Sequence, residues 1–243
     1  MEENNEILEL ATKNYSPDEP SPFENRWYNN GTKKTHKKVK AWLKNKVNEK
    51  TLILNAGSGG SNYGINDVSM VHLDIVDKLI NMHENYLVAS IDCIPCEDNS
   101  FDVVICVGSV LNYADITLAI KELSRVLKPS GTLILEFERS NSAEFLFTKK
   151  HHKNVVLCDE QYGSQRHKFW LYGEKFVLEL LENYKMKCTK KYRFHVISSL
   201  VSRITKTENF PARFTFLDSC FKPLSYPLAS NIMLHLIKCE NTT

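Results

Sequence analysis

The stretch TLILNAGSGGSNYG, residues 51–64, begins as a short apolar run and ends in a cluster of glycines. Thr51 to Leu54 are typical of a buried strand, and Gly57, Gly59 and Gly60 follow closely. Glycine stands where the backbone bends sharply or approaches another group closely. The pattern therefore predicts a strand that ends in a tight loop, with a ligand or another chain segment near its backbone.

Further strand-like runs follow this one, and several are continuously apolar, as in strands buried on both faces of a parallel sheet. They cover residues 68–75, 86–92, 101–108 and 132–138. A helix is expected over 116–128, with an apolar stripe of Ile116, Ala119, Ile120, Leu123 and Leu127, before Pro129 and Gly131. Helices are also expected at about 33–49 and 173–184, and an antiparallel strand pair at about 187–195 and 231–239. The alternation of strands and helices predicts an α/β domain.

The composition is that of an ordinary globular protein. Of the 243 residues 42% are apolar and 25% charged, and the net charge is +2, which favours neither nucleic acid nor membrane as a partner. We find no apolar run of about 18 residues, so no membrane span is expected. The acidic N-terminus is unlike a signal peptide, and the seven cysteines favour reduced thiols, so the expected location is cytoplasmic.

Two carboxylates are predicted at the ends of neighbouring strands. Asp74 ends the second strand-like run and Asp92 ends the third. Ligands of open α/β sheets bind beyond the carboxyl ends of the strands. An acid at the first of these positions can accept both hydroxyls of a ribose, and one at the second can accept from an adenine amino group. The glycine loop and these two acids together indicate a nucleoside-containing ligand.

Four motifs carry a resemblance to a known family: LILNAGSGG, HLDI, ASIDCIPCEDNSFDVVICVGSVLNY and ELSRVLKPSGTLILEF. In this order they resemble the motifs of class I S-adenosylmethionine-dependent methyltransferases of the small-molecule, methyltransferase-11-like type, over about residues 51–138. The resemblance implies a Rossmann-like, mostly parallel seven-stranded sheet with an antiparallel last strand, and S-adenosyl-L-methionine as cofactor. It implies cofactor contacts from Asn55, Gly57, Ser58, Gly59, Asp74, Ile75, Asp92, Cys93 and Gly108.

The sequence departs from the family pattern at the glycine loop. Asn55 stands where the family has an acid, Ser61 where it has a third glycine, and the crossover to Asp74 is about one helical turn short. We expect residues 1–32 to form a cap or flexible segment whose Arg26 and Tyr28 complete the cofactor site, since arginine pairs with carboxylates. Residues 33–243 are expected to be the methyltransferase domain, with insertions at about 140–172 and 196–230.

Other functions remain open at this stage. Asn55 and Ser61 leave room for a non-catalytic protein that binds cofactor or a partner. A nicotinamide-dependent oxidoreductase is disfavoured because the loop does not complete G-x-G-x-x-G. The pair Cys93 and Cys96 has no second pair to complete a zinc site, so no metal is expected. Eight lysines against one acid in residues 33–50 favour a solvated helix face over an RNA site.

The methyl acceptor is expected between the ends of the fourth and fifth strands and the two insertions. Tyr113 and His167 are the candidate catalytic residues, the first to orient the acceptor and the second as a base. A basic acceptor favours Glu136, and an acidic acceptor favours Arg139. Further candidates near the pocket are Ser109, Phe137, Trp170, Tyr172 and His195, whereas His151 and His152 are expected on an exposed turn. The acceptor atom and the oligomeric state stay undetermined.

Overall fold

The computed structural model describes residues 2–18, 26–44, 46–65, 70–162, 165–196 and 226–240, with backbone alone at 26–28, 162 and 226. The helices are α1 (Glu2–Asn14), α2 (Arg26–Leu43), α3 (Asp77–Ile80), α4 (Ile116–Val126) and α5 (Glu174–Asn183). The strands are β1 (Ile53–Ala56), β2 (Met70–Asp74), β3 (Tyr86–Val88), β4 (Phe101–Cys106), β5 (Leu127–Glu138), β6 (Val155–Tyr162), β7 (Gln165–Tyr172), β8 (Met186–Phe194) and β9 (Asn231–Lys238). Short 3-10 helices are η3 (Val110–Tyr113), η4 (Ala143–Phe145) and η6 (Tyr226–Leu228).

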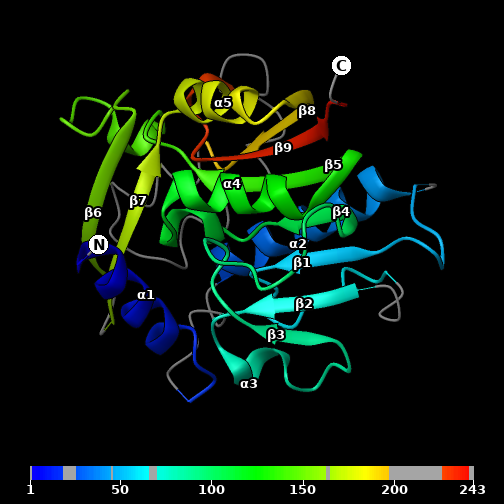
Figure 1. The fold of residues 1–243 in the computed structure, drawn as a ribbon. Helices are drawn as coiled ribbons and strands as arrows, with labels where there is room; N and C mark the ends of the chain where they lie inside the picture. The colour runs from blue at the N-terminus through cyan, green and yellow to red at the C-terminus, as the bar shows by residue number, and fades with distance from the viewer. Residues whose placement is uncertain are drawn as a thin grey trace.

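Seven strands form one sheet in the order β3-β2-β1-β4-β5-β9-β8 (Figure 1). Strands β1 to β5 pair in parallel, and β9 pairs antiparallel with both β5 and β8. This arrangement confirms the predicted mostly parallel seven-stranded sheet with an antiparallel last strand. The predicted antiparallel pair at the end of the chain is also confirmed, since β8 and β9 are neighbours.

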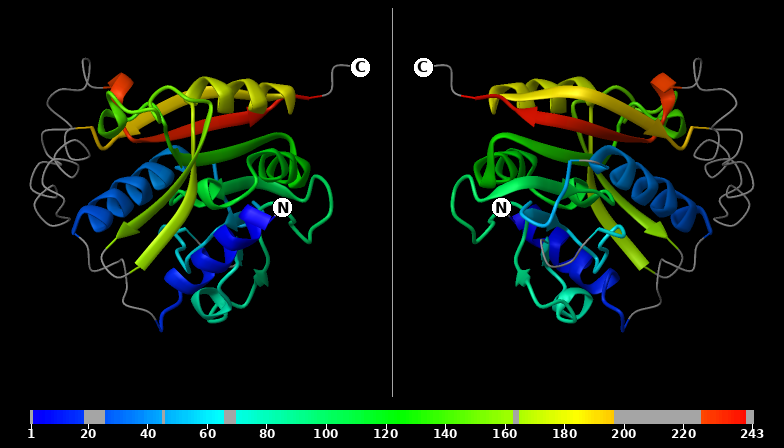
Figure 2. Two further views of the ribbon diagram at one scale, coloured as in Figure 1. Left: turned by 90° about the vertical axis from the view of Figure 1, so that its left-hand side faces the viewer. Right: turned by 90° about the vertical axis from the view of Figure 1, so that its right-hand side faces the viewer.

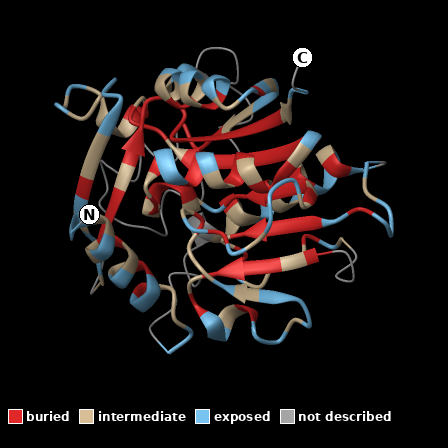
Figure 3. Ribbon diagram, viewed as in Figure 1, coloured by how far each residue is buried: buried red, intermediate tan, exposed pale blue. Residues whose placement is uncertain are grey.

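Alternation along the central strands sends their side chains into two separate cores. Ile53, Ile105 and Ile134 pack with Val39 and Leu43 of α2 on one face of the sheet. Their sequence neighbours Leu54, Cys106 and Leu135 pack toward α4 and α5 on the other face. Figure 2 shows the helices on the two sides of the sheet, and Figure 3 shows its central strands as buried. Burial on both faces explains why the central parts of these strands are mostly apolar in sequence.

Two of the helices, α4 and α2, have different ends from those predicted. Helix α4 starts where the Asp115 carboxylate accepts hydrogen bonds from the backbone N–H groups of Thr117 and Leu118. It ends at Val126 rather than at residue 128, because Leu127 already pairs with Phe101 as part of β5. Helix α2 spans residues 26–43 rather than 33–49. A turn follows it in which Oδ1 of Asn48 accepts the N–H of Lys50 and Oγ1 of Thr51 accepts the N–H of Asn48.

The N-terminal segment contains a helix that the sequence analysis does not predict. Helix α1 packs against β7 and η3, and Ile7 and Ala11 are buried beneath it. The predicted insertion at 140–172 contains the β6–β7 hairpin, a separate two-stranded sheet at the side of the main one. Most of the insertion predicted at 196–230 lies outside the described residues. The division at residue 32 stays a prediction.

The third strand is shorter than predicted. It ends at Val88, after which Ala89 donates its N–H to the Asp74 carbonyl and the chain turns away. The prediction that Asp92 ends this strand is therefore wrong, because residues 91–100 form turns instead.

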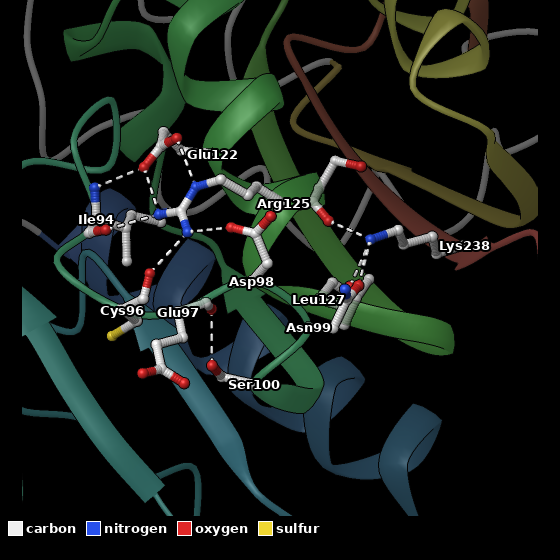
Figure 4. A network of polar contacts seen from close by, with 11 residues as sticks. Ile94, Cys96, Glu97, Asp98, Asn99, Ser100, Glu122, Arg125, Leu127 and Lys238 are labelled. Carbon is white, nitrogen blue, oxygen red and sulfur yellow. Dashed lines mark hydrogen bonds and ion pairs between the residues drawn. The ribbon is translucent and has the colours of Figure 1, made fainter.

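Arg125 of α4 fixes the loop that follows (Figure 4). Its guanidinium donates to the carbonyls of Ile94 and Cys96 at 2.8 and 2.7 Å, and to the carboxylate of Asp98 at 2.8 Å. Glu122, one turn back on α4, holds the same guanidinium through two bonds and also accepts the Ile94 N–H. A planar guanidinium can satisfy several carbonyl and carboxylate oxygens at once. The loop motif between β3 and β4 is therefore held by a residue of the next motif.

Candidate functional site

A cavity of about 350 Å³ lies at the carboxyl ends of β1, β2, β4 and β5. This volume lies within the range of roughly 300–1,000 Å³ found for small-molecule sites. Residues of helices α1 and α2 also line it. The residues discussed below that line it are Tyr15, Gly31, His36, Gly57, Ser58, Gly59, Asp74, Ile75, Gly108, Ser109, Val110, Tyr113, Glu136, Glu138, His195 and Asn231.

The glycines after β1 serve two different purposes. Gly57 has φ +73°, and a Cβ there would lie 2.3 Å from Cγ2 of Val110, so this glycine allows the loop to pack on η3. Gly59 has φ +53°, and a Cβ there would meet no atom within 4 Å. Its N–H donates to Oδ2 of Asp74 at 2.8 Å. Gly59 therefore leaves open space beside a carboxylate, which is the arrangement that a ligand requires.

Asn55 supports this loop from below rather than lining the cavity. It is fully buried, and its amide donates to the Ser61 carbonyl at 2.6 Å and to Oγ of Ser58 at 3.1 Å. Oγ of Ser58 in turn lies 2.6 Å from Nδ1 of His72. Asn55 and Ser61, the two departures from the family pattern, are thus partners in one loop-stabilising network. Of the residues predicted here, Ser58 lines the cavity and Asn55 does not.

Asp74 and Ile75 stand at the end of β2 and line the cavity as predicted. Asp74 is 9% exposed and also accepts the N–H of Val76 at 3.0 Å. Burial raises the pKa of its carboxyl, against the opposing effect of the backbone N–H groups of Gly59, Val76 and Ile75. Each carboxylate oxygen keeps a further lone pair that can accept from a ligand hydroxyl.

The ends of β4 and β5 meet in a second polar cluster. Gly108 has φ +88° with open space where a Cβ would stand, and Ser109 has φ +60°. This left-handed turn aims two backbone N–H groups at Oε2 of Glu136, at 2.7 and 2.6 Å. Asn231, the first residue of β9, donates to Oε1 of Glu136 at 2.7 Å. Glu136 is therefore a well-satisfied carboxylate that fixes the loop after β4.

Glu138 lies two residues after Glu136 on the same face of β5, and its carboxylate accepts fewer hydrogen bonds than that of Glu136. Oγ of Ser109 donates to its Oε1 at 3.2 Å. Burial, the charge of Glu136 and the charge of Glu160 raise the pKa of Glu138 to about 7, and the hydroxyl of Ser109 opposes this rise. At neutral pH this carboxyl therefore exchanges a proton readily.

Two phenols stand at the same end of the cavity. The hydroxyl of Tyr113 lies 3.1 Å from the hydroxyl of Tyr15, and the two rings meet edge to face. Tyr113 was predicted as an acceptor-positioning residue, and it lines the cavity. Tyr15 was not predicted, because nothing in the polar N-terminal sequence indicates that a helix folds back over the strand ends.

Several other predicted residues lie outside the cavity. Within the described residues its lining excludes Asp92 and Cys93, and Asp92 instead accepts the N–H of Asp115 at 3.4 Å. His167 lies on β7 opposite Glu160, also away from the lining. The side chains of Arg26 and Tyr28 lie outside the described part of the structure.

Arg139 does not face the acceptor side either. Its guanidinium is buried, donates to Glu174 at 2.7 Å and donates to the carbonyl of Ala229. The expectation that Arg139 receives an acidic acceptor is wrong, because the strand's alternation places this side chain in a structural ion pair. Trp170 donates to Asn4 of α1, and Tyr172 donates to the carbonyl of Ala114, so both are framework residues.

Besides Tyr15, several other cavity residues were not predicted from the sequence. His36 of α2 lines the cavity, with its Nε2 3.3 Å from Oγ of Ser61. Glu138 and Asn231 also line it. The only sequence signal for them is position at the end of a predicted strand, which Glu138 shares with Glu136. Among the described residues there is no group of three possible metal-ligating side chains.

Residues 53–135 match the family model described as Methyltransferase domain. Uncharacterized protein MJ0638 of Methanocaldococcus jannaschii is 32% identical over 117 residues, which is 44% of this chain and 52% of that protein. The ubiquinone/menaquinone biosynthesis C-methyltransferase UbiE of Rickettsia prowazekii is 33% identical over 87 residues, 30% of this chain and 35% of that protein. The chain thus spans about half of these relatives' length or less.

The fold is also shared with a solved methyltransferase structure. The 1,6-didemethyltoxoflavin-N1-methyltransferase of Burkholderia thailandensis, solved with S-adenosylhomocysteine, superposes with a TM-score of 0.52 at 14% identity, over 84% of this chain and 78% of that chain. The match to the methyltransferase family model thus lies within residues 53–135, and the fold of the wider chain is similar to that of this solved methyltransferase.

Proposed function

We propose that this protein transfers a methyl group from S-adenosyl-L-methionine to a small-molecule acceptor. The observation that carries the proposal is the pairing of Gly59 and Asp74 at one end of a cavity that also reaches Glu138 and Tyr113. One end suits a nucleoside and the other suits an acceptor. One relative is named a ubiquinone/menaquinone biosynthesis C-methyltransferase and one structural neighbour a 1,6-didemethyltoxoflavin-N1-methyltransferase, and both names support a small acceptor.

The residues present fit the cofactor. Open space beside Gly59 and Gly108 lets a ligand approach the backbone after β1 and β4. Asp74 offers carboxylate oxygens to ribose hydroxyls, and the apolar side chains of Ile75, Val76 and Ile91 line the wall where a base would lie. Ser58, Gly59, Gly108, Asp74 and Ile75 would therefore hold the group. Contributions from Asn55 through the loop, and from Asp92, Cys93, Arg26 and Tyr28, stay predictions.

S-adenosylmethionine supplies a methyl group made electrophilic by a sulfonium charge. The protein has to align an acceptor with that group and exclude water. Helix α1 covers the acceptor end through Leu8, Ala11 and Tyr15. Tyr113 borders the same space with a phenol that can orient the acceptor by hydrogen bonding. His167, the other candidate catalytic residue, stays a prediction.

The alternative is a protein that binds the cofactor without turnover. Isothermal titration of the purified chain with S-adenosylhomocysteine and with NADH tests the cofactor, and mass spectrometry of an acceptor panel tests transfer. Binding of the first ligand alone together with one methylated product supports the proposal. Binding without transfer to any acceptor supports the non-catalytic alternative, and failure to bind S-adenosylhomocysteine contradicts both.

The helices and the cysteines of the described residues concern the partners and the location of the protein. No helix in the described ranges is both long enough and apolar enough to cross a membrane. The six cysteines of the described residues are free thiols. They are consistent with the cytoplasmic location that we propose, because thiols stay reduced there. Nucleic acid is not proposed as a partner, and the oligomeric state is left to measurement.

A further inference from the structure

The acceptor end of the cavity has a chemical character that narrows the substrate class. Resting on the methyltransferase function proposed above, we propose that the acceptor is a small molecule with a basic nitrogen, and that Glu138 binds this nitrogen and takes the proton that it loses. The acceptor would occupy the space between the end of β5, η3 and helix α1. The argument starts from the charges that line this space.

Acidic side chains line the cavity, and the described lining holds no Lys or Arg. The carboxylates are Asp74 at the cofactor end and Glu136 and Glu138 at the acceptor end. Its two histidines are neutral at physiological pH: burial lowers the pKa of His36, and burial and the charge of Lys34 lower the pKa of His195 to about 3. A carboxylate or phenolate acceptor would meet like charges here, whereas a protonated amine would meet opposite ones.

The two glutamates are not equivalent. Glu136 accepts from two backbone N–H groups and from Asn231, so its charge is already compensated. The carboxylate of Glu138 has a single hydrogen bond within the described chain, from Ser109 to Oε1 at 3.2 Å. Its Oε2 is thus the carboxylate oxygen best able to accept an N–H bond from a ligand. The distinction places the acceptor nitrogen at Glu138 rather than at Glu136.

Aromatic rings border the same space. Tyr15 and Tyr113 both line it, with their hydroxyls 3.1 Å apart and their ring planes at 85° to each other. Aromatic rings stabilise organic cations through their faces as well as by shape. The combination of one incompletely bonded carboxylate and two phenols is suited to a protonated amine more than to a quinone oxygen.

The proton step follows from the ionisation of Glu138. The groups that influence this carboxyl are Glu136 on β5, Ser109 after β4, Glu160 on β6, and the thiol of Cys158, which also lies within its electrostatic reach. The phenol of Tyr15 lies within the same field. Because the pKa is raised to about 7, the carboxylate is present above that pH and becomes neutral below it.

The atoms balance as follows. The ammonium N–H gives its proton to Glu138, and the freed nitrogen lone pair forms the new N–CH3 bond. The S–CH3 bond breaks with its electron pair left on sulfur, giving S-adenosylhomocysteine. The proton leaves Glu138 to solvent before the next turnover. No oxidant, metal or further reactant is required.

Binding and turnover of matched probes test the proposal. Phenethylamine and tryptamine provide cations, their N-acetyl forms provide neutral counterparts, and 3-phenylpropionate and indole-3-propionate provide anions. Calorimetry on the protein saturated with S-adenosylhomocysteine should detect the amines and neither counterpart. Amine affinity should fall about tenfold from pH 8 to pH 6, because Glu138 becomes protonated over that interval. Mass spectrometry with S-adenosylmethionine should show N-methylated amines.

The Glu138→Gln variant separates this proposal from the parent function. It should bind S-adenosylhomocysteine within twofold of wild type, lose the pH dependence of amine binding, and lose about a hundredfold in turnover. Glu179→Gln, at an exposed carboxylate of α5, is the matched control and should change neither property. Should the glutamine variant unfold, the wild-type pH profile and the probe series still decide.

The outcomes separate the two proposals. Normal binding of S-adenosylhomocysteine with no amine bound or methylated, or with methyl transfer to the carboxylates, would overturn the amine proposal and leave the methyltransferase function standing. An unchanged Glu138→Gln variant would overturn the role of Glu138. Failure of the wild type to bind S-adenosylhomocysteine would overturn both.

Discussion

The hydroxyl of Tyr15 lies 3.1 Å from the hydroxyl of Tyr113, and this contact joins the N-terminal helix to the loop that follows β4. It is one of several polar contacts that hold α1 in place. Asn4 accepts from Trp170 at 3.1 Å, Asn14 donates to the Arg166 carbonyl at 2.8 Å, and Glu6 pairs with Lys168. Helix α1 is thus attached to both the β6–β7 hairpin and the acceptor end of the cavity.

Deleting residues 2–18 should therefore open the cavity without unfolding the sheet. The two sheet cores contain no residue of α1, so circular dichroism should show the same secondary structure apart from one helix. Affinity for S-adenosylhomocysteine should fall about tenfold or more, since the helix shields charge-assisted bonds from water. Tyr15→Phe keeps the ring and should therefore lose much less affinity for S-adenosylhomocysteine than the deletion does. Unchanged affinity after the deletion would show that the helix is no lid.

Gly57→Ala and Gly59→Ala should impair different properties, the first mainly stability and the second mainly ligand binding. At Gly57 a methyl group would lie 2.3 Å from Val110, and φ is +73°, so we expect a loss of about 2–4 kcal/mol in the free energy of unfolding. At Gly59 there is room for the methyl group, and the left-handed backbone should cost only about 1 kcal/mol. Chemical denaturation measures both.

For the loss of ligand affinity the order of the two variants should be reversed, with Gly59→Ala affected more than Gly57→Ala. Gly59→Ala places its methyl group in the cavity and should weaken S-adenosylhomocysteine binding about tenfold in calorimetry. Adding Val110→Ala to Gly57→Ala should recover part of the lost stability, because it removes the atoms that clash. Equal effects of the two glycine variants on both measurements would contradict the division of roles between them.

The sheet could be predicted from sequence because its signal is local. Runs such as residues 103–107 are apolar at every position, since alternate side chains enter two cores, and each run ends at a recognisable turn. Helix α1 gives no such signal: its buried side chains are few, and its partners on β7 lie far away in the sequence. Its placement depends on tertiary contacts such as that between Glu6 and Lys168.

The site residues that stand at the ends of strands could be predicted from the sequence. Those that the N-terminal helix contributes by packing over the strand ends could not. Asp74, Gly108 and Tyr113 line the cavity because they follow directly from β2 and β4. The family motif that contains Cys93 lines the cavity only through its first residues, 89–91, and not through Asp92 or Cys93. Arg125 holds the loop that follows, so the later part of the motif supports the edge of the sheet.

Replacing Asp74 should weaken cofactor binding while leaving the fold intact. We expect Asp74→Ala to reduce affinity for S-adenosylhomocysteine by about 1.5–3 kcal/mol, roughly tenfold to a hundredfold, because ribose hydroxyls would lose a charged acceptor. The affinity of Asp74→Asn for S-adenosylhomocysteine should lie between those of the wild type and Asp74→Ala, since asparagine keeps one side-chain oxygen. Asp77→Ala, at an exposed acid three residues on, is the control. Similar losses in the Asp77 variant would indicate a general charge effect.

Acid should destabilise the protein through His195, which stands at the end of β8 with 4% of its surface exposed. Burial, and then the charge of Lys34, lower its pKa to about 3 from an ordinary value of 6.5. Between these values the unfolded chain binds a proton that the folded chain does not. Stability therefore falls by up to about 1.4 kcal/mol for each pH unit below 6.5, until the folded pKa is reached.

The substitution His195→Asn removes this titration, and asparagine tolerates the left-handed φ of +57° at this position. Urea denaturation at pH 7 and pH 5 should show that the variant loses about 2 kcal/mol less on acidification than the wild type does. His235, whose pKa burial lowers to about 4, contributes in the same direction in both proteins and therefore cancels in the comparison. The exposed His152→Asn is the control and should lose as much as wild type. An equal loss in the His195 variant would mean that this ring is protonated in the folded protein.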